Sequence, residues 1–287
     1  MAELIDGREI ALGIQQEVNE AFQSFKIRPG EEPKLVALLV GDNKEARLYV
    51  KAQKKAADSI GVLFVTLDIN EDASHDDIID KIEELNRDSS VTAVLVQHPL
   101  PGKFDHNKII SKLRPEKDAE GVHPTNLGKL FRKEADIVPC TPGAVMRILK
   151  SKGVDLYGKD VVIIGHSPIV GKPLSLMMLN KTATTTVCHI GTAEKGDITS
   201  YSRKADVLVV AVGRPGIVEG DWIKNGAIVI DVGINSRDGK IVGDVCFDEA
   251  CKRASMITPV PGGVGPVTVS MLMRNVLEAY KAQHGKF

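Results

Sequence analysis

Residues 160–180 read DVVIIGHSPIVGKPLSLMMLN, and this stretch decides the fold class. It begins with a run of β-branched apolar residues typical of a buried strand, continues through a turn that holds Gly165 and Gly171, and ends in an apolar segment with helical character. A glycine-bearing turn between a buried strand and a helix lets backbone N–H groups and the helix dipole face a phosphate. The stretch therefore predicts a βα unit suited to a nucleotide. Its G-x5-G spacing differs from G-x-G-x-x-G, and a tight turn without a ligand fits the same pattern.

Similar apolar runs alternate with helical patterns along the rest of the chain. They are KLVALLVG (34–41), LFVTLDI (63–69), TAVLVQ (92–97), TTTVCHI (184–190), DVLVVAVG (206–213) and AIVIDVG (227–233). Nearly continuous apolar strands belong to sheets that are covered on both faces, so the pattern predicts parallel α/β structure.

The break between two βα series lies at VPCTPGAVMRILKSKG, where Thr141 is the expected N-cap of a helix and Pro142 its expected first residue. We predict two α/β domains. The first comprises residues 1–140 together with a C-terminal helix over 266–287, and the second comprises residues 141–265.

The composition excludes several classes of protein. The 287 residues carry 37 Lys and Arg against 38 Asp and Glu, a formal net charge of −1, which argues against an electrostatic nucleic-acid binder. No apolar run reaches the roughly 18 residues that span a bilayer. The four cysteines form no C-x-x-C pair, so we expect neither a disulfide framework nor a metal site. Charges between Glu3 and Glu9 interrupt any signal-peptide core, and we expect a cytoplasmic protein.

A second glycine-rich loop, TPVPGGVGPVTVSML at 258–272, is more distinctive. Three glycines and three prolines directly before a helix describe a rigid loop whose backbone can approach a flat ligand closely. A purely structural turn is the alternative.

Together with DVGIN (231–235), VQHPLP (96–101), PCTP (139–142) and the helix around Tyr49, this loop resembles the tetrahydrofolate dehydrogenase/cyclohydrolase family over essentially the whole chain. The resemblance implies a folate-facing N-terminal domain, a Rossmann-like dinucleotide-binding domain, a cleft between them and a homodimer. It also implies oxidation of 5,10-methylenetetrahydrofolate to 5,10-methenyltetrahydrofolate by hydride transfer to a nicotinamide dinucleotide. Members of the family commonly hydrolyse the methenyl product as well.

The resemblance carries over a set of folate-side residues. Catalytic roles are implied for Tyr49, Gln53, Gln97 and Glu120. Substrate contacts are implied for Tyr49, Val96, Gln97, His98, Glu120, Pro261, Gly262 and Gly263. Glu120 stands where the family has an aspartate that receives the N–H donors of the pterin, so a carboxylate is still available for that bidentate contact. His98 occupies a usually apolar position, where it either lines the pocket or replaces a missing proton carrier.

Gln53 is the most consequential departure from the family pattern, which has a lysine four residues after the tyrosine. That spacing places both side chains on one helix face, and the lysines at 51, 54 and 55 point in other directions. A glutamine amide does not titrate, whereas hydrolysis of the methenyl group requires proton transfer. We therefore expect retained dehydrogenase activity and weak or absent cyclohydrolase activity.

On the cofactor side, contacts are implied for Gly165, His166, Ser167, Ile169, Ile190, Ile234 and Thr268. Family members that use NADP tend to have an arginine in the glycine turn and a serine followed by a basic residue after the next strand. This chain has His166, Ile190 and Gly191 instead, which favours NAD by omission. No acidic residue closes that strand to bind a ribose hydroxyl, and Lys172 or Lys195 offers charge nearby, so NADP remains the alternative.

Three functions remain open from the sequence. The leading one is an NAD-linked methylenetetrahydrofolate dehydrogenase. The first alternative is an ordinary bifunctional NADP-dependent enzyme that forms 10-formyltetrahydrofolate. The second is a non-catalytic folate-binding paralogue, against which the retained Tyr49, Gln97 and both glycine loops argue.

Overall fold

The computed structural model describes residues 1–25, 27–28 and 30–285. The chain forms two compact units, unit 1 with Met1–Ala11 and Thr141–Thr268, and unit 2 with Leu12–Cys140 and Val269–Phe287. These ranges differ from the expected domains at the N-terminus, because the first strand, β1 (Glu3–Leu4), pairs in parallel with β11 (Met256–Ile257) and so belongs to unit 1.

Unit 2 is built on a parallel sheet whose described strands follow the order β3-β2-β4. The strands are β2 (Lys34–Val40), β3 (Leu63–Ile69) and β4 (Ala93–Val96). All three lie within the expected ranges. The apolar run of β2 is buried from Leu35 to Val40, whereas β3 exposes Leu63 and Val65 at the edge of the sheet.

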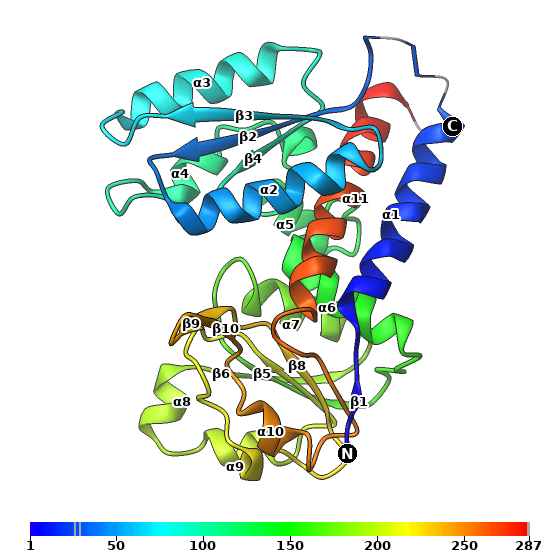
Figure 1. Ribbon diagram of the computed structural model, residues 1–287, viewed down its shortest axis with the longest axis vertical. Helices are drawn as coiled ribbons and strands as arrows, with labels where there is room; N and C mark the ends of the chain where they lie inside the picture. The colour runs from blue at the N-terminus through cyan, green and yellow to red at the C-terminus, as the bar shows by residue number, and fades with distance from the viewer. Residues whose placement is uncertain (26, 29, 286–287) are drawn as a thin grey trace. The chain divides into compact units, whose positions relative to one another are not determined.

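The helices of unit 2 connect and cover these strands. In Figure 1, α2 (Lys44–Asp58) and α3 (His75–Arg87) flank the β2–β3 pair from opposite sides. Asn43 caps α2, because its Oδ1 accepts a hydrogen bond from the Ala46 N–H at 2.8 Å. The other helices are α1 (Gly7–Ser24), α4 (His106–Ile110), the 3₁₀ turn η1 (Pro115–Lys117), α5 (Pro124–Phe131) and α11 (Val264–His284), of which α1 and α11 begin in unit 1.

Unit 1 contains a six-stranded parallel sheet among its described residues, in the order β1-β11-β8-β7-β5-β6. The strands not yet bounded are β5 (Asp160–Ile164), β6 (Thr184–Cys188), β7 (Val207–Val210) and β8 (Ile228–Asp231). The chain passes from β5 to β6 on one side and then returns to β7 on the other. This reversal is the switch point of a doubly wound sheet, outside whose strand ends nucleotides bind. The expected α/β class is therefore confirmed, with a Rossmann-like sheet in unit 1.

The remaining elements of unit 1 are short helices and one hairpin. They are α6 (Cys140–Ser151), α7 (Gly171–Leu179), α8 (Ile190–Glu194), α9 (Ile198–Ser202), η2 (Gly220–Trp222), α10 (Phe247–Ala250), and the antiparallel pair β9 (Asn235–Arg237) and β10 (Lys240–Val242). The expected N-cap of α6 was wrong: the helix begins at Cys140, so Thr141 lies inside its first turn. The Cys140 N–H donates to the Glu120 carbonyl at 3.2 Å and needs no capping side chain.

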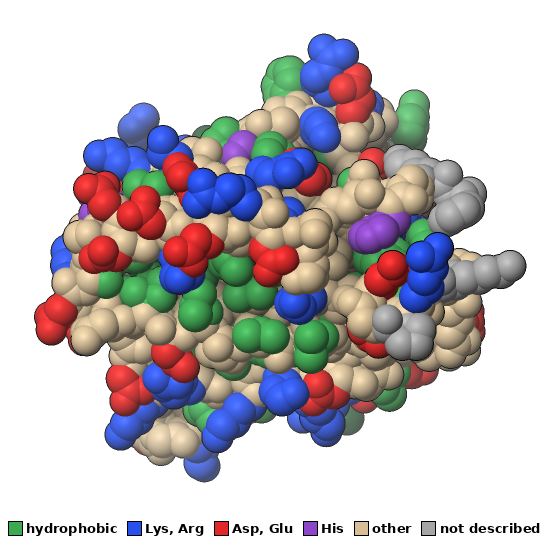
Figure 2. Space-filling model, turned by 90° about the horizontal axis from the view of Figure 1, so that it is seen from above, with side chains coloured by type: hydrophobic (Ala, Val, Ile, Leu, Met, Phe, Trp, Pro, Cys, Tyr) green, Lys and Arg blue, Asp and Glu red, His purple; other side chains and the backbone are tan. Residues whose placement is uncertain are grey.

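The surface carries charges of both signs. Figure 2 shows cationic and anionic side chains interspersed over one face, with apolar side chains between them. This mixture agrees with the formal net charge of −1. Over the described part of the chain, no helix combines the length and apolarity needed to cross a membrane.

Candidate active site

Two of the folate-side residues, Gln53 and Gln97, form a pair of buried amides. Tyr49 and Gln53 share one face of α2, and Gln97 directly follows β4. Gln53 is 2% exposed and Gln97 is 4% exposed. The Gln97 Nε2 donates a hydrogen bond to the Gln53 Oε1, while the Gln97 backbone N–H donates to the Leu38 carbonyl at 2.9 Å. The structure therefore brings these predicted residues together.

The neighbouring lysines of α2 do not replace the missing family lysine. The helix is continuous from Lys44 to Asp58. Lys51, Lys54 and Lys55 are exposed, and the Lys54 Nζ lies 2.9 Å from a carboxylate oxygen of Asp58. The amide of Gln53 thus occupies the buried position alone.

Asp118 shapes the loop that presents Glu120. Its carboxylate is fully buried and accepts hydrogen bonds from the backbone N–H groups of Glu120, Gly121 and His123 and from the amide of Asn126, at 2.8–3.2 Å. Burial raises the pKa of Asp118, while the hydrogen bond from His123 is the largest opposing effect. A glycine is required at 121, because φ is +79° and a Cβ there would lie 2.3 Å from the Val138 carbonyl oxygen.

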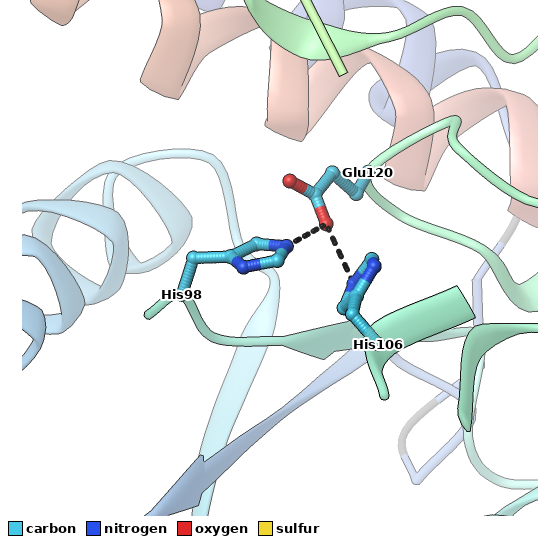
Figure 3. A group of neighbouring side chains, drawn as sticks. All are labelled: His98, His106 and Glu120. Atoms are coloured by element: carbon cyan, nitrogen blue, oxygen red, sulfur yellow. Dashed lines mark ion pairs between the residues drawn. The ribbon is translucent and has the colours of Figure 1, made fainter. Parts of the chain in front are cut away.

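Glu120 faces two histidines. Its Oε2 lies 3.8 Å from the His98 Nε2 and 4.0 Å from the His106 Nε2, and Figure 3 shows the other carboxylate oxygen pointing away from both rings. Burial, with a smaller contribution from Asp118, raises the pKa of Glu120 to about 8. Burial lowers the pKa of His98, and burial with the nearby His98 lowers the pKa of His106 to about 4. The three side chains are mainly uncharged at neutral pH.

Tyr49 and Cys140 lie in the same electrostatic environment. Burial raises the pKa of the Tyr49 hydroxyl, and Cys140 and Glu120 raise it further, so the hydroxyl remains a hydrogen-bond donor. Burial likewise raises the pKa of the Cys140 thiol, whose Sγ lies 3.4 Å from the Ala119 carbonyl oxygen. A thiol in this state is a poor nucleophile.

The remaining predicted substrate contacts lie outside the group formed by Tyr49, Cys140 and Glu120. Val96 is the last residue of β4 and is 1% exposed, so its side chain belongs to the core of unit 2. Pro261, Gly262 and Gly263 belong to unit 1.

The glycine turn of unit 1 requires both of its glycines. Gly165 directly follows β5 with φ at +125°, and a Cβ there would lie 2.2 Å from the Ala211 carbonyl oxygen. A Cβ on Gly171 would lie 2.0 Å from the Gly165 carbonyl oxygen. Within the turn, the Ser167 Oγ accepts a hydrogen bond from the Val170 N–H at 3.1 Å, and Ile169 is half-buried. The G-x5-G spacing thus reflects close packing of α7 against the end of β5.

The residues expected to select the dinucleotide lie at the ends of β5 and β6. The rings of His166 and His189 lie 5.0 Å apart between centroids. The His189 Nδ1 accepts a hydrogen bond from the Gly191 N–H at 3.2 Å, and the side chain of Ile190 is 60% exposed. Lys172 and Lys195 are exposed.

The proline-glycine loop lines a pocket within unit 1. The pocket has an empty volume of about 560 Å³ and is lined by Arg8, Ile241, residues 231–234 and residues 259–266. Ile234, which is 60% exposed, thus lines the same pocket as Gly262 and Gly263. Thr268 is not among its lining residues, and its Oγ1 donates to the Val264 carbonyl at 3.2 Å within α11.

His106 is the residue of this site that the sequence analysis missed. It opens α4, which Asp105 caps, and it follows His98 after an intervening Pro/Gly-containing loop. The separation of eight residues matches no common helical or metal-ligand spacing, because the loop rather than a regular element brings the two rings within 4.1 Å between centroids. The sequence does contain one signal for this site, because a second histidine follows soon after a histidine at a usually apolar position.

Comparisons with known proteins cover both units. Residues 5–120 match the tetrahydrofolate dehydrogenase/cyclohydrolase catalytic domain, and residues 139–284 match the NAD(P)-binding domain of the same description. The bifunctional protein FolD of Staphylococcus carnosus is 42% identical over an alignment of length 287 that covers 99% of each chain. The bifunctional enzyme FolD from Campylobacter jejuni superposes with a TM-score of 0.93 at 43% identity, covering 98% of this chain and 99% of that one. The methylenetetrahydrofolate dehydrogenase-cyclohydrolase of Trypanosoma brucei, solved with NADP and an inhibitor, superposes with a TM-score of 0.92 at 41% identity and covers 98% of both chains.

Proposed function

Because the chain belongs to the tetrahydrofolate dehydrogenase/cyclohydrolase family, we propose that it oxidises 5,10-methylenetetrahydrofolate with a nicotinamide dinucleotide and hydrolyses the methenyl product to 10-formyltetrahydrofolate. The observation that carries the proposal is the match to relatives named as bifunctional enzymes along nearly the whole chain. These relatives favour the bifunctional alternative over the weak hydrolysis expected from Gln53.

The dehydrogenase step asks the protein mainly for positioning, because the nitrogen lone pairs of the substrate drive hydride transfer. We assign three folate contacts. The Tyr49 ring packs against the folate, the Glu120 carboxylate receives the pterin N–H groups, and Gln97 hydrogen-bonds beside them. The glycine turn at Gly165 supports the dinucleotide, and the loop at Gly262 and Gly263 contacts the substrate. His166, Ser167, Ile169, Ile190, Ile234 and Thr268 complete the proposed dinucleotide contacts.

The hydrolytic step requires a proton carrier other than Gln53, because an amide does not titrate. Addition of water to the methenyl carbon is followed by proton transfer and cleavage of a C–N bond. His98 and Glu120 are titratable side chains near the amide pair, and we assign the proton transfer to them.

A second candidate is a dehydrogenase with little hydrolysis. It is favoured by the hydrogen bond from Gln97 to Gln53, which occupies both amides in the position where the family has a lysine. Neither group of this pair accepts or releases a proton near neutral pH.

For the dinucleotide we propose NAD. Ile190 is exposed where an NADP enzyme has a hydroxyl, and His166 replaces a permanent cation. NADP is the alternative, since the T. brucei relative was solved with it and Lys172 and Lys195 are exposed.

One assay separates these functions. The purified protein is mixed with methylenetetrahydrofolate and either dinucleotide, and the reduced nicotinamide and the methenyl chromophore are followed separately. Both chromophores are expected to form, and the methenyl signal is expected to decay faster than in buffer. A methenyl signal that decays at the rate in buffer would favour the second candidate. No reduced nicotinamide with either dinucleotide would favour the non-catalytic paralogue.

We also propose a homodimer and a cytoplasmic location. The open edge of β3 exposes Leu63 and Val65, and an apolar strand edge is a surface suited to pairing with a second copy. The location is supported by the four cysteines, all of which are free.

A further inference from the structure

Three buried polar atoms converge beside the amide pair and lack hydrogen-bond partners. They are the Nε2 atoms of His98 and His106 and the Oε2 atom of Glu120, and none of them bonds to another described residue. Buried polar atoms without partners are costly, roughly 1–3 kcal/mol each, so three at one point indicate a place that can bind a ligand.

The three side chains come from separate elements but reach the same point. His98 follows β4, His106 opens α4, and Glu120 lies on the loop shaped by Asp118. Figure 3 shows both rings and the carboxylate directed toward one another. The distances from Oε2 to the two Nε2 atoms are 3.8 and 4.0 Å, longer than a hydrogen bond.

This spacing suits a metal ion. One donor atom from each residue lies within 4.8 Å of the other two, so a single point lies within about 2.8 Å of all three atoms. Zinc lies about 2.0–2.2 Å from nitrogen and carboxylate ligands, so the donors need to close by about 0.8 Å at most. Rotation of the His98 and His106 side chains supplies such a shift, because the first follows a strand end and the second belongs to a five-residue helix.

We propose that His98, His106 and Glu120 bind a divalent first-row transition metal ion. Two imidazoles and one carboxylate favour zinc, iron, cobalt or nickel over magnesium or calcium, which prefer oxygen ligands. Three protein ligands leave coordination positions for water, as in catalytic rather than structural sites. The site goes beyond the proposed function, and a bound ion would occupy the His98 and Glu120 atoms to which that function assigns proton transfer, so the two roles exclude each other while the ion is bound. The site also differs from the expectation that the chain has no metal site, which rested on cysteine spacing alone.

The carboxylate can serve this ion and a pterin together. The oxygen that faces the histidines is Oε2, and the other oxygen points away from them. An aspartate at 120, as in the family pattern, is one methylene shorter and would leave its oxygen farther from both rings. The replacement of the family aspartate by Glu120 and the presence of His98 and His106 are thus parts of one arrangement.

The test is a cobalt titration of the whole protein after treatment with a chelator. We expect one equivalent of Co²⁺ to bind, with visible d–d absorption bands and without the near-ultraviolet thiolate band that cysteine ligands produce. Zn²⁺ is expected to displace it and Mg²⁺ is not. His98→Gln, His106→Gln and Glu120→Gln are each expected to weaken binding at least tenfold.

The matched control is His284→Gln, which removes an exposed histidine that stacks on Tyr280. It should bind cobalt as the wild type does. Circular dichroism and dinucleotide affinity establish that each variant is folded. Equal cobalt binding by wild type and His106→Gln, a thiolate band, displacement by Mg²⁺, or no binding by the wild type would each overturn the proposal. Since the readout is the ion and not turnover, it is independent of the proposed activity.

Discussion

Gln97 donates a hydrogen bond to Gln53, and both amides are almost completely buried. The pair joins the end of β4 to the middle of α2 and satisfies one donor and one acceptor that water does not reach. A lysine at 53 would place a charge at the same buried position, and the side-chain oxygen of Gln97 could accept a hydrogen bond from it.

Gln53→Lys is expected to raise the rate of methenyltetrahydrofolate hydrolysis by about tenfold to a hundredfold, because it introduces a group able to transfer a proton. Dehydrogenase activity should change little. The decay of the methenyl absorbance measures the first rate and reduced nicotinamide the second. The control is Gln53→Met, which keeps the approximate volume without a titrating group. The same hydrolysis rate in both variants would contradict the prediction.

Glu120→Gln is expected to weaken folate binding by about 1.5–3 kcal/mol, because the N–H donors of a bound pterin favour the ionised form of Glu120, and the amide removes this acceptor from the bidentate contact. The dissociation constant of a folate analogue, measured by calorimetry, checks this. Dinucleotide affinity should stay the same. If both ligands bind more weakly by the same factor, the role of Glu120 is in folding rather than in recognition.

His166→Arg combined with Ile190→Ser is expected to shift the ratio of kcat/KM values toward NADP by about 1–3 kcal/mol, because a fixed cation and a hydroxyl become available to the 2′-phosphate. The wild type should prefer NAD. Steady-state kinetics with both dinucleotides give the ratio. A wild type that prefers NADP would contradict the assignment, and Lys172→Gln and Lys195→Gln would then identify the partner of the phosphate.

Because of Asp231, the free energy of unfolding of unit 1 is expected to fall as pH rises from about 4 to about 6. The Asp231 carboxylate accepts hydrogen bonds from the N–H groups of Gly233, Asp244 and Val245, yet burial raises its pKa to about 6, above the 3.8 of an exposed aspartate. Between these values the folded state holds more protons than the unfolded state, so the free energy of unfolding falls with rising pH, by about 2–3 kcal/mol.

Chemical denaturation of the wild type and Asp231→Asn at pH 4 and pH 7 isolates this effect from that of other carboxylates. From pH 4 to pH 7, the free energy of unfolding of Asp231→Asn should rise relative to that of the wild type. Asp221→Asn, at an exposed position, is the control. A relative stability that is the same at both pH values would show that the pKa of Asp231 is not raised.

Val65→Lys is expected to weaken the proposed homodimer, because it places a charge on the exposed edge of β3. Light scattering coupled to size-exclusion chromatography gives the mass of the wild type and the variant over a range of concentrations. Lys54→Glu, at an exposed position on α2, is a charge-changing control. An unchanged dimer in Val65→Lys would place the interface elsewhere.

The sequence predicted the central strands of both units well, because buried parallel strands carry uninterrupted apolar runs. β2 and β5 lie where KLVALLVG and DVVIIG predict them. The two-residue strands β1 and β11 are too short to produce such a pattern, and their pairing brings Met1–Ala11 into unit 1. Long-range pairings of this kind depend on the whole fold and not on local periodicity.

The candidate site was predictable only in part. Tyr49 and Gln53 share a helix face, so the sequence spacing alone predicts that their side chains lie close together. His106 approaches His98 through a loop whose path the sequence does not specify, and the burial that raises the pKa of Glu120 comes from several segments packed together. The positions of these side chains depend on loops, so only the structure shows that they meet.

The parallel pairing of β1 with β11 also bears on how the chain is made. Glu3 pairs with Met256, about 250 residues later, so during synthesis on the ribosome the first strand remains unpaired until these residues have been made and its partner emerges. The sheet of unit 2 needs only the segment from Lys34 to Val96. The nascent chain therefore has the strands of unit 2 available early, whereas the sheet of unit 1 is completed only after Ile257 has been made.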